Sequence, residues 1–219
     1  MTPGSVLPQD FYARDPKAVA RDLLGKVITR GRVAARIVEV EAYLGERDPG
    51  SHAFRGPTHR NATMFGPPGF LYVYFTYGMH WCANVVCTTE GEAGAVLLRA
   101  GAPLSGLATM RKRRPAARRD LDLCSGPAKL CEALGITGRD DGTDLRGGPI
   151  RIVDDREPAP PRRTSPRIGL AAGRGDHHRW RWYVPGDPNV SGPKGVGART
   201  ARRQWTERPR AGYPGEQRA

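Results

Sequence analysis

Residues 26–45, KVITRGRVAARIVEVEAYLG, restrict the fold more than any other segment of the chain. The pattern predicts a β-hairpin that turns near Gly31, with strong β propensity in its second arm. Successive side chains of a strand point to opposite faces. In the second arm, one face would carry Val38, Val40 and Ala42, and the other Ile37, Glu39, Glu41 and Tyr43. The apolar face is therefore predicted to be the core side of a sheet.

The remaining periodic segments complete an α+β pattern. Further strands are predicted over 70–75, 80–88, 94–104, 148–155 and 180–186, and helices over 15–25, 104–113 and 124–136. Asp15 and Pro16 are typical of a helix start and Gly135 of a helix end, with Ser125 as the expected cap of the last helix. We expect one α+β domain, in which a mostly antiparallel sheet is flanked by helices.

The chain of 219 residues is long enough for one domain with a buried core. Residues 1–9 are expected to be a loose leader and residues 10–191 the folded domain. Gly, Pro and Arg dominate residues 192–219 and apolar periodicity ends there, so a basic, disordered tail is expected. No segment resembles a signal peptide or the run of about 20 apolar residues that spans a membrane.

The formal charge of +13 indicates a polyanionic partner. Residues 192–219 carry seven Lys/Arg against two Asp/Glu, so the folded part is itself basic. Arginine supplies 30 of the 35 basic residues, which suits bidentate phosphate contacts, although genomic base composition explains the same bias. The four cysteines lack zinc-ligand spacing and His177-His178 have no cysteine cluster nearby, so no metal site is expected.

Several polar residues lie on or beside predicted strands. Glu41 and Tyr43 would lie side by side on one strand face, as a general base beside a stacking platform would, although an ordinary solvated face fits as well. His52 follows in a polar loop, Asn84 interrupts an apolar strand, and Arg99 ends another. Each has a plain alternative: a surface histidine, an amide that ties down backbone, and a structural arginine paired with a carboxylate such as Glu41.

Together these residues predict one concave site, because neighbouring antiparallel strands can share a face. The predicted pocket is walled by Tyr43, Tyr74 and His52, floored by Glu41 and Arg99, and has Asn84 at its side. Aromatic rings with polar groups at the edge suit a flat nitrogenous ring. On a basic protein, the simplest such ring is a nucleobase turned out of its strand.

Two further features suit a nucleic-acid partner. Tyr77 stands beside Gly78 at the expected turn between strands 70–75 and 80–88, where an aromatic wedge would fill the gap left by a flipped base; packing against its own hairpin is the alternative. The run 111–119, RKRRPAARR, would follow phosphates or form a mobile basic loop. Lys129, near a helix start, would also meet a phosphate.

The chain resembles the alkyladenine (3-methyladenine) DNA glycosylase family, of the type known from mammals and also found in bacteria, over roughly residues 10–191. The resemblance is carried in unbroken order by RIVEVEAYLG, THRNATMFGPPGFLYVYFTYGMHWCANV, AVLLRA, CSGPAKLCEALGI and PRIGLA. It implies one α+β domain around a curved antiparallel sheet, without metal or cofactor. It also implies a monofunctional enzyme that flips alkylated or deaminated purines out of duplex DNA and hydrolyses the N-glycosidic bond, leaving an abasic site.

The resemblance assigns roles to the predicted pocket. Glu41 would activate the attacking water, which Arg99 and the backbone carbonyl of Ile168 would help to hold. The flipped base would be clasped by Tyr43, His52 and Tyr74. Asn84 would reject guanine by crowding its exocyclic amino group.

Outside the pocket, Tyr77 would intercalate, and Met79, His80 and Lys129 would contact the DNA backbone or groove. His80 departs from the mammalian members, which have a tyrosine there. The implied partner is double-stranded DNA with damaged purines, and we expect a cytoplasmic, nucleoid-associated monomer. Two other classes stay open: a non-catalytic DNA-kinking or lesion-reading protein, and an enzyme acting on the bases of RNA or free nucleosides.

Overall fold

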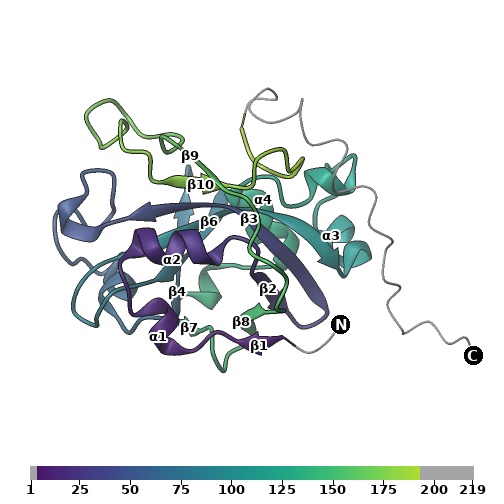
Figure 1. Ribbon diagram of the computed structural model, residues 1–219, viewed down its shortest axis with the longest axis horizontal. Helices are drawn as coiled ribbons and strands as arrows, with labels where there is room; N and C mark the ends of the chain where they lie inside the picture. Colours follow the sequence, from purple (N-terminus) through teal and green to yellow (C-terminus); the bar gives the residue numbers. More distant parts are fainter. Residues whose placement is uncertain (1–3, 193–219) are drawn as a thin grey trace, which may run out of the picture.

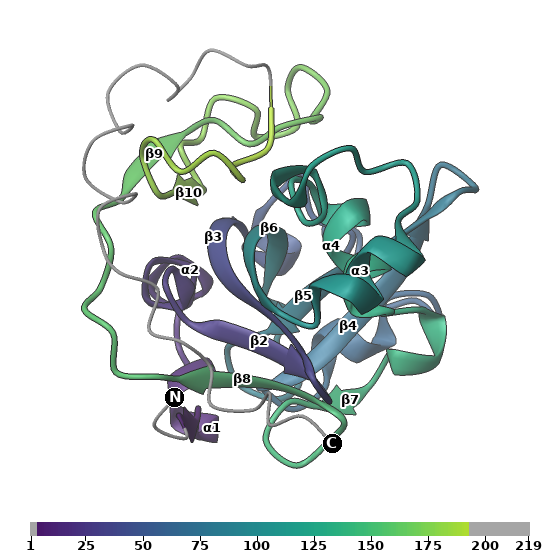
Figure 2. The ribbon, with the colours of Figure 1, turned by 90° about the vertical axis from the view of Figure 1, so that its right-hand side faces the viewer.

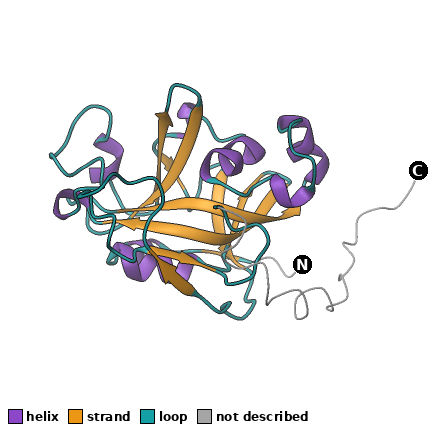
Figure 3. Cartoon of the chain, turned by 90° about the horizontal axis from the view of Figure 1, so that it is seen from above, coloured by secondary structure: helices purple, strands orange, loops and turns teal. Residues whose placement is uncertain are grey.

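A computed structural model describes residues 4–192 of the chain (Figure 1). It contains a 10-stranded sheet in the order β1-β8-β2-β3-β6-β5-β4-β7, with β10 on β3 and β9 on β10, and every pair within the described residues is antiparallel. The strands are β1 (Ser5–Val6), β2 (Val27–Arg30), β3 (Val33–Tyr43), β4 (Phe70–Thr76), β5 (His80–Val86), β6 (Ala95–Ser105), β7 (Thr143–Asp144), β8 (Ile150–Asp154), β9 (Arg163–Ser165) and β10 (Arg181–Tyr183). The sheet curls instead of lying flat (Figure 3). The expected single α+β domain with a curved sheet is confirmed.

Helices cover the curled sheet at two places. They are α1 (Gln9–Tyr12), α2 (Pro16–Leu23), α3 (Leu107–Arg113) and α4 (Pro127–Leu134), with 3-10 turns at Gly45–Arg47, Ala62–Phe65, Asp120–Asp122 and Gly138–Asp140. Helix α2 packs against β3 and β6, whereas α4 packs against β5 and β6 with α3 beside it (Figure 2). Buried side chains of α2 and α4 belong to one apolar core together with the sheet.

Strand β3 lies at the centre and has a different neighbour along each half of one edge. Its first half pairs with β2 and its second half with β10, while β6 runs along the other edge. A β-bulge interrupts the β3–β6 register between Ile37 and Val40. Because of it, Ile37 joins the main core together with Val40, and Val38 packs instead against Ala100 and Val184.

This bulge corrects the predicted faces of β3. Strict alternation would place Ile37 with the polar residues and Val38 with the core. In the structure the core face changes from odd to even residues within the strand, as expected where an extra residue is accommodated. The segment after the bulge keeps the predicted arrangement, with Val40 and Ala42 in the core and Glu41 on the other face.

The turn between β4 and β5 holds Tyr77 in an unusual conformation. Tyr77 and Gly78 have φ angles of 50° and 64°, and the amide of Met79 donates to the carbonyl of Thr76 at 3.1 Å. Positive φ at both central positions gives a hairpin turn whose twist matches its strands. The side chain of Tyr77 is 83% exposed.

Several expected boundaries need correction. Ser5 and Val6, placed in a loose leader, pair with β8, and Leu7 is buried. Ser125 is not the cap of α4: Gly126 occupies the N-cap position without a side-chain hydrogen bond. Asp15, in contrast, caps α2 by accepting from the amide of Lys17, and Gly135 ends α4 in the left-handed conformation. The basic tail predicted over 192–219 lies outside the described residues, except for residue 192.

The basic run 111–119 belongs partly to α3 and is tied down by acidic partners. Arg111 pairs with Asp120, Arg119 with Asp122, and the buried Arg114 with Glu132. Its predicted phosphate contacts stay a prediction. Among residues 4–192, no helix is both long and apolar enough to cross a membrane.

Candidate active site

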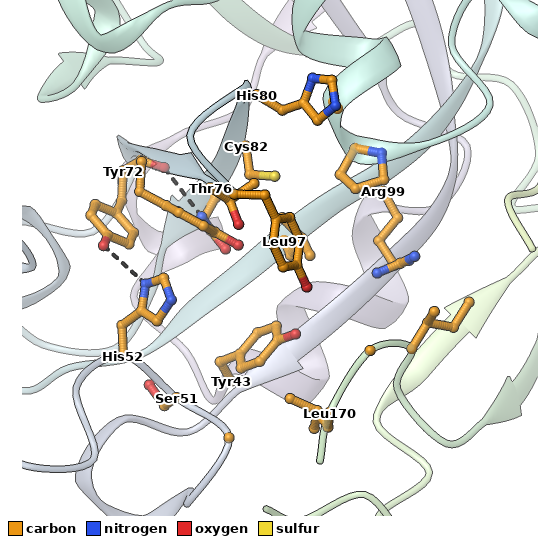
Figure 4. A pocket seen from close by; sticks show the side chains of 18 of the residues that line it. Tyr43, Ser51, His52, Tyr72, Thr76, His80, Cys82, Leu97, Arg99 and Leu170 are labelled. Atoms are coloured by element: carbon orange, nitrogen blue, oxygen red, sulfur yellow. Dashed lines mark hydrogen bonds between the residues drawn. The ribbon is translucent and has the colours of Figure 1, made fainter.

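A cavity of about 380 Å³ opens where β3 to β6 meet the loops at 50–52 and 168–170 (Figure 4). This volume falls within the range of small-molecule sites. Most of the predicted site residues lie in its wall, namely Tyr43, His52, Tyr74, Tyr77, His80, Asn84, Arg99 and Ile168. Tyr72, Cys82 and Leu97 line it as well.

Glu41 lies directly behind this wall and is fully buried. Its Oε2 accepts hydrogen bonds from the hydroxyl of Tyr43 at 3.0 Å and from Nη1 of Arg99 at 3.1 Å. Its Oε1 accepts from the backbone amide of Ile168 at 2.7 Å. Hydrogen bonds to a carboxylate are short and directional, so these three donors fix its orientation. All three donors belong to residues of the cavity wall.

Three phenol groups of the wall, those of Tyr43, Tyr72 and Tyr74, stay protonated at neutral pH. Burial, followed by the nearby Glu41 carboxylate, raises the pKa of Tyr43 well above its ordinary value of 10. Burial also raises the pKa of Tyr74 above that value, and raises the pKa of Tyr72 to about 12. Tyr43 is therefore a hydrogen-bond donor to Glu41 and not a competing anion.

One side of the cavity is aromatic. The rings of His52 and Tyr74 meet edge to face with centroids 4.4 Å apart, and Tyr72 and Tyr74 stack at 5.6 Å. Nδ1 of His52 lies 3.1 Å from the hydroxyl of Tyr72 (Figure 4). Burial, and then the charge of Arg60, lower the pKa of His52 below its ordinary value of 6.5, so the imidazole is neutral at pH 7 and above. Uncharged, electron-rich rings are good stacking partners.

Asn84 lies in the wall, and its amide also ties two strands together. Its Nδ2 donates to the carbonyl of Tyr72 at 3.3 Å, and the residue is 5% exposed. The plain alternative for this residue, a backbone contact, is therefore present. Its predicted exclusion of guanine stays a prediction.

Arg99 reaches the predicted partner Glu41 and a second carboxylate as well. Its Nε donates to Oε1 of Glu39 at 3.0 Å, and its Nη2 to the hydroxyl of Ser191 at 3.3 Å. Burial alone would lower the pKa of Arg99, but the charges of Glu41 and Glu39 raise it above its ordinary value. The guanidinium is thus held on all three of its nitrogens.

A second buried ion pair holds the loop that carries Ile168. Arg167 forms two hydrogen bonds with Asp48, at 2.6 and 2.8 Å, and both side chains are fully buried. Its guanidinium carbon lies 4.6 Å from the centre of the Tyr43 ring and 5.0 Å from that of Trp180. The pair therefore places the Ile168 amide on Glu41 and supports the back of a wall ring.

Two predicted contact residues stand apart from the cavity. Met79 is 68% exposed on the hairpin tip, and Lys129 is exposed at the start of α4, with Nζ 3.3 Å from the Ser125 hydroxyl. Their DNA contacts stay predictions. Ile168 lies in the cavity wall and donates its backbone amide to Glu41, a contact that was not predicted. The role of its carbonyl in holding the water stays a prediction.

The sequence interpretation missed Glu39, Asp48, Arg167 and Arg181. Only Glu39 carried a local signal, as a charged residue inside an apolar strand. The other three are buried by contacts with segments more than 100 residues away, which no local pattern reports.

A buried carboxylate behind an aromatic cavity, on a curled antiparallel sheet, has the geometry of a small-molecule site on an α+β domain. Comparison with known proteins narrows this description. The family model for methylpurine-DNA glycosylase matches residues 10–188. The chain therefore belongs to the methylpurine-DNA glycosylase family, as its resemblance implied.

Relatives from bacteria and an archaeon carry the provisional name 3-methyladenine DNA glycosylase. One from Burkholderia lata is 55% identical over 197 residues, which covers 87% of this chain and 93% of the relative. One from Streptomyces avermitilis is 48% identical, with coverage of 91% and 96%. One from the archaeon Methanocella arvoryzae is 47% identical, with coverage of 85% and 96%.

Proposed function

We propose that this protein is a monofunctional DNA glycosylase, which flips alkylated or deaminated purines out of duplex DNA and hydrolyses their N-glycosidic bond. The observation that carries the proposal is the fully buried Glu41, held by Tyr43, Arg99 and Ile168 directly behind an aromatic cavity. Family membership and the basic composition support a DNA substrate.

The aromatic wall suits a purine made cationic by alkylation. Such a ring is attracted to the faces of tyrosine, and it leaves readily because its departure neutralises the charge. His52, which is neutral above pH 7, adds no repulsion to a cationic base. Neutral lesions such as hypoxanthine would depend more strongly on hydrogen bonds from the pocket.

In the proposed reaction, Glu41 takes a proton from water as that water attacks C1′ of the deoxyribose. The bond that breaks joins C1′ to the purine nitrogen, whose electron pair leaves with the base. The negative charge of Glu41 also favours the oxocarbenium character of the sugar. The products are the free base and an abasic site.

A lyase step would need an amine that forms a Schiff base with the sugar. The cavity wall, as far as the structure describes it, contains no lysine. Lys129 is the lysine nearest in sequence to a wall residue, and its Nζ is directed to Ser125 outside the wall. Borohydride trapping of a protein–DNA adduct would contradict the monofunctional assignment.

The test is base excision from a duplex with one hypoxanthine or ethenoadenine, and from methylated DNA, with alkali to reveal abasic sites. We expect strand breaks after alkali only. Glu41→Gln should abolish excision and leave binding to the lesion duplex largely intact. Glu90→Gln makes the same change of charge at an exposed loop residue and should excise like the wild type.

The non-catalytic reader remains the second candidate because Tyr77 is exposed on a strained turn. It predicts tight binding to lesion DNA without base release, and no effect of Glu41→Gln. A third candidate is an enzyme that acts on the bases of RNA or free nucleosides. Competition between lesion DNA, undamaged DNA and undamaged RNA distinguishes it from the two DNA-directed candidates.

A further inference from the structure

The proposed base belongs to a buried cluster of four charged side chains, Glu39, Glu41, Arg99 and Arg181. Its centre is Glu39, which is fully buried and accepts from Arg99, from Nε of Arg181 at 2.6 Å, and from both the amide and the hydroxyl of Ser191, at 2.6 and 2.9 Å. With Glu41, the cluster contains two carboxylates and two guanidinium groups, so its charges balance.

The cluster gives Arg99 a single orientation. Its Nε is held by Glu39, its Nη2 by the hydroxyl of Ser191, and its Nη1 is left for Glu41. Arg181 completes the arrangement from β10: its Nε neutralises Glu39, its Nη1 donates to Ser165 and its Nη2 to the carbonyl of Ser191. Without Arg181, the buried charge of Glu39 would draw Arg99 away from Glu41.

We propose that Glu39, Arg181 and Ser191 form a charge-balanced clamp that positions Arg99, and through it sets the proton affinity of the base Glu41. This inference rests on the proposed function of Glu41. The three residues are positioning residues, since none of them lines the cavity.

Three titratable groups near Glu41 stay uncharged at neutral pH. Burial raises the pKa values of Tyr43, Tyr74 and Cys82, so all three are neutral. Arg167 lies over the outer side of Tyr43 and is already paired with Asp48. The charged and titratable groups around Glu41 are thus Glu39 and Tyr43 from β3, Tyr74 from β4, Cys82 from β5, Arg99 from β6, Arg167 from the loop after β9 and Arg181 from β10.

Two substitutions change the net charge of this cluster in opposite directions. Glu39→Gln leaves one excess positive charge, which favours the ionised base, so single-turnover excision should persist to lower pH. Arg181→Gln leaves one excess negative charge, so the low-pH limb should move to higher pH. Each shift should be about one pH unit, as expected for one charge a few ångströms from the base in a protein interior.

Loss of the clamp should lower the excision rate and spare lesion binding. We expect single-turnover rates to fall by about 10- to 100-fold in both variants, the range that small misplacements of catalytic groups produce. Affinity for the lesion duplex should stay within a few-fold of the wild type. Ser191→Ala removes a neutral group, so it should slow excision without a shift of the pH profile.

The double variant Glu39→Gln/Arg181→Gln keeps the cluster neutral. It therefore separates an effect of charge, which it should cancel, from a folding defect, which it should not. Its low-pH limb should return toward that of the wild type while its rate stays low. Shifts of the two single variants in the same direction, or wild-type rates in Glu39→Gln, would overturn the clamp.

A second measurement does not depend on turnover. The ¹³C-carboxylate signal of Glu41, assigned by its loss in Glu41→Gln, is titrated by NMR in the wild type, the two single variants and the double variant. Its midpoint should move down in Glu39→Gln and up in Arg181→Gln. Unmoved midpoints would refute the charge coupling. Moved midpoints in a protein that excises no base would retain the clamp and refute the glycosylase.

Discussion

Tyr77 combines a strained backbone with an almost fully exposed side chain. Its φ of 50° is costly for a bulky residue, by about 1–3 kcal/mol, and a side chain that is 83% exposed gains little from packing in return. Strain without a packing benefit is typical of residues placed for binding. The conformation therefore supports the predicted wedge over packing of Tyr77 against its own hairpin.

A substitution of Tyr77 is therefore predicted to reduce activity without reducing stability. Tyr77→Gly should leave the free energy of unfolding unchanged or raise it by about 1 kcal/mol, because glycine adopts positive φ without strain. Excision of a paired lesion should fall by about tenfold or more, as expected when an aromatic contact worth about 1–3 kcal/mol is lost. Thermal melting and single-turnover excision measure the two effects.

Tyr77→Phe retains the ring and the strain and serves as the matched control, so it should excise normally. A lesion in a bulge is already unpaired and should be less sensitive to Tyr77→Gly. Equal losses on paired and bulged lesions would refute the wedge.

At the scale of elements, the Arg167–Asp48 pair joins the loop that follows β3 to the loop that follows β9. Removing one partner of a buried pair leaves an uncompensated charge. Asp48→Asn should therefore lower the free energy of unfolding by about 3–5 kcal/mol. Urea denaturation measures this loss. Asp144→Asn breaks the half-exposed pair with Arg146 and should cost less than about 1 kcal/mol.

Asp48→Asn should also slow excision, because Arg167 places the Ile168 amide on Glu41. Wild-type stability and rate in this variant would show that the loop is held by its backbone contacts alone.

The elements that local sequence predicts are those with strong internal signals. The hairpin 26–45, the strand pair around Tyr77 and the helix capped by Asp15 follow from alternation, turn glycines and capping chemistry. The short strands β1, β7 and β9 have two or three residues, too few for a period, and exist because a distant strand offers them partners. The Ser125 cap failed because Gly126 adopts φ of 155° and takes the N-cap position itself.

The candidate site likewise contains some residues that the sequence could predict and others that it could not. Glu41, Tyr43, Tyr74 and Asn84 could be predicted because each falls on a recognisable strand. Glu39 carried the signal of a charge inside an apolar strand, but no role could be assigned to it, since its partners Arg181 and Ser191 are 142 and 152 residues away in the chain. Only the pairing of β10 with β3 brings them together.

At the scale of the whole molecule, acid should destabilise the fold through paired carboxylates. The hydrogen bonds from Lys26 and Arg146 lower the pKa values of Asp154 and Asp144. For Asp155, burial acts in the opposite direction, but the hydrogen bond from Arg36 lowers its pKa. A carboxyl whose folded pKa is depressed stabilises the fold above its unfolded value, about 3.9, and this stabilisation is lost as the pH falls through that value and on to the folded pKa.

The free energy of unfolding should therefore decline steeply below about pH 4, where the high positive charge adds repulsion. Asp154→Asn should flatten this decline and leave the pH 7–8 region parallel to the wild type. Denaturation curves at several pH values measure both. An unchanged slope would show that the pair with Lys26 contributes nothing to acid unfolding.

The high charge also predicts how the protein meets DNA. Binding to undamaged duplex should weaken steeply with salt, since each neutralised phosphate contributes about 0.9 to the slope of log affinity against log salt. Arg60 lies close enough to the cavity to lower the pKa of His52, so Arg60→Gln should reduce that slope by about one. Arg151 is exposed on β8 and does not line the cavity, so Arg151→Gln should leave the salt slope unchanged.

The bulge in β3 has a consequence for how this strand can change in evolution. The half before it, Val33 to Ile37, turns its odd residues to the core, whereas the half after it turns its even residues inward. Packing substitutions in the first half therefore leave the phase of Glu41 untouched. Deleting Val38 would only remove the extra residue and restore regular alternation, with Ile37 and Val40 still in the core. Inserting one residue between Val40 and Glu41 would instead reverse the phase of the strand end and turn Glu41 toward the apolar interior. For this strand, the spacing between Val40 and Glu41 is under tighter constraint than the spacing within the bulge or the identity of the apolar residues around it.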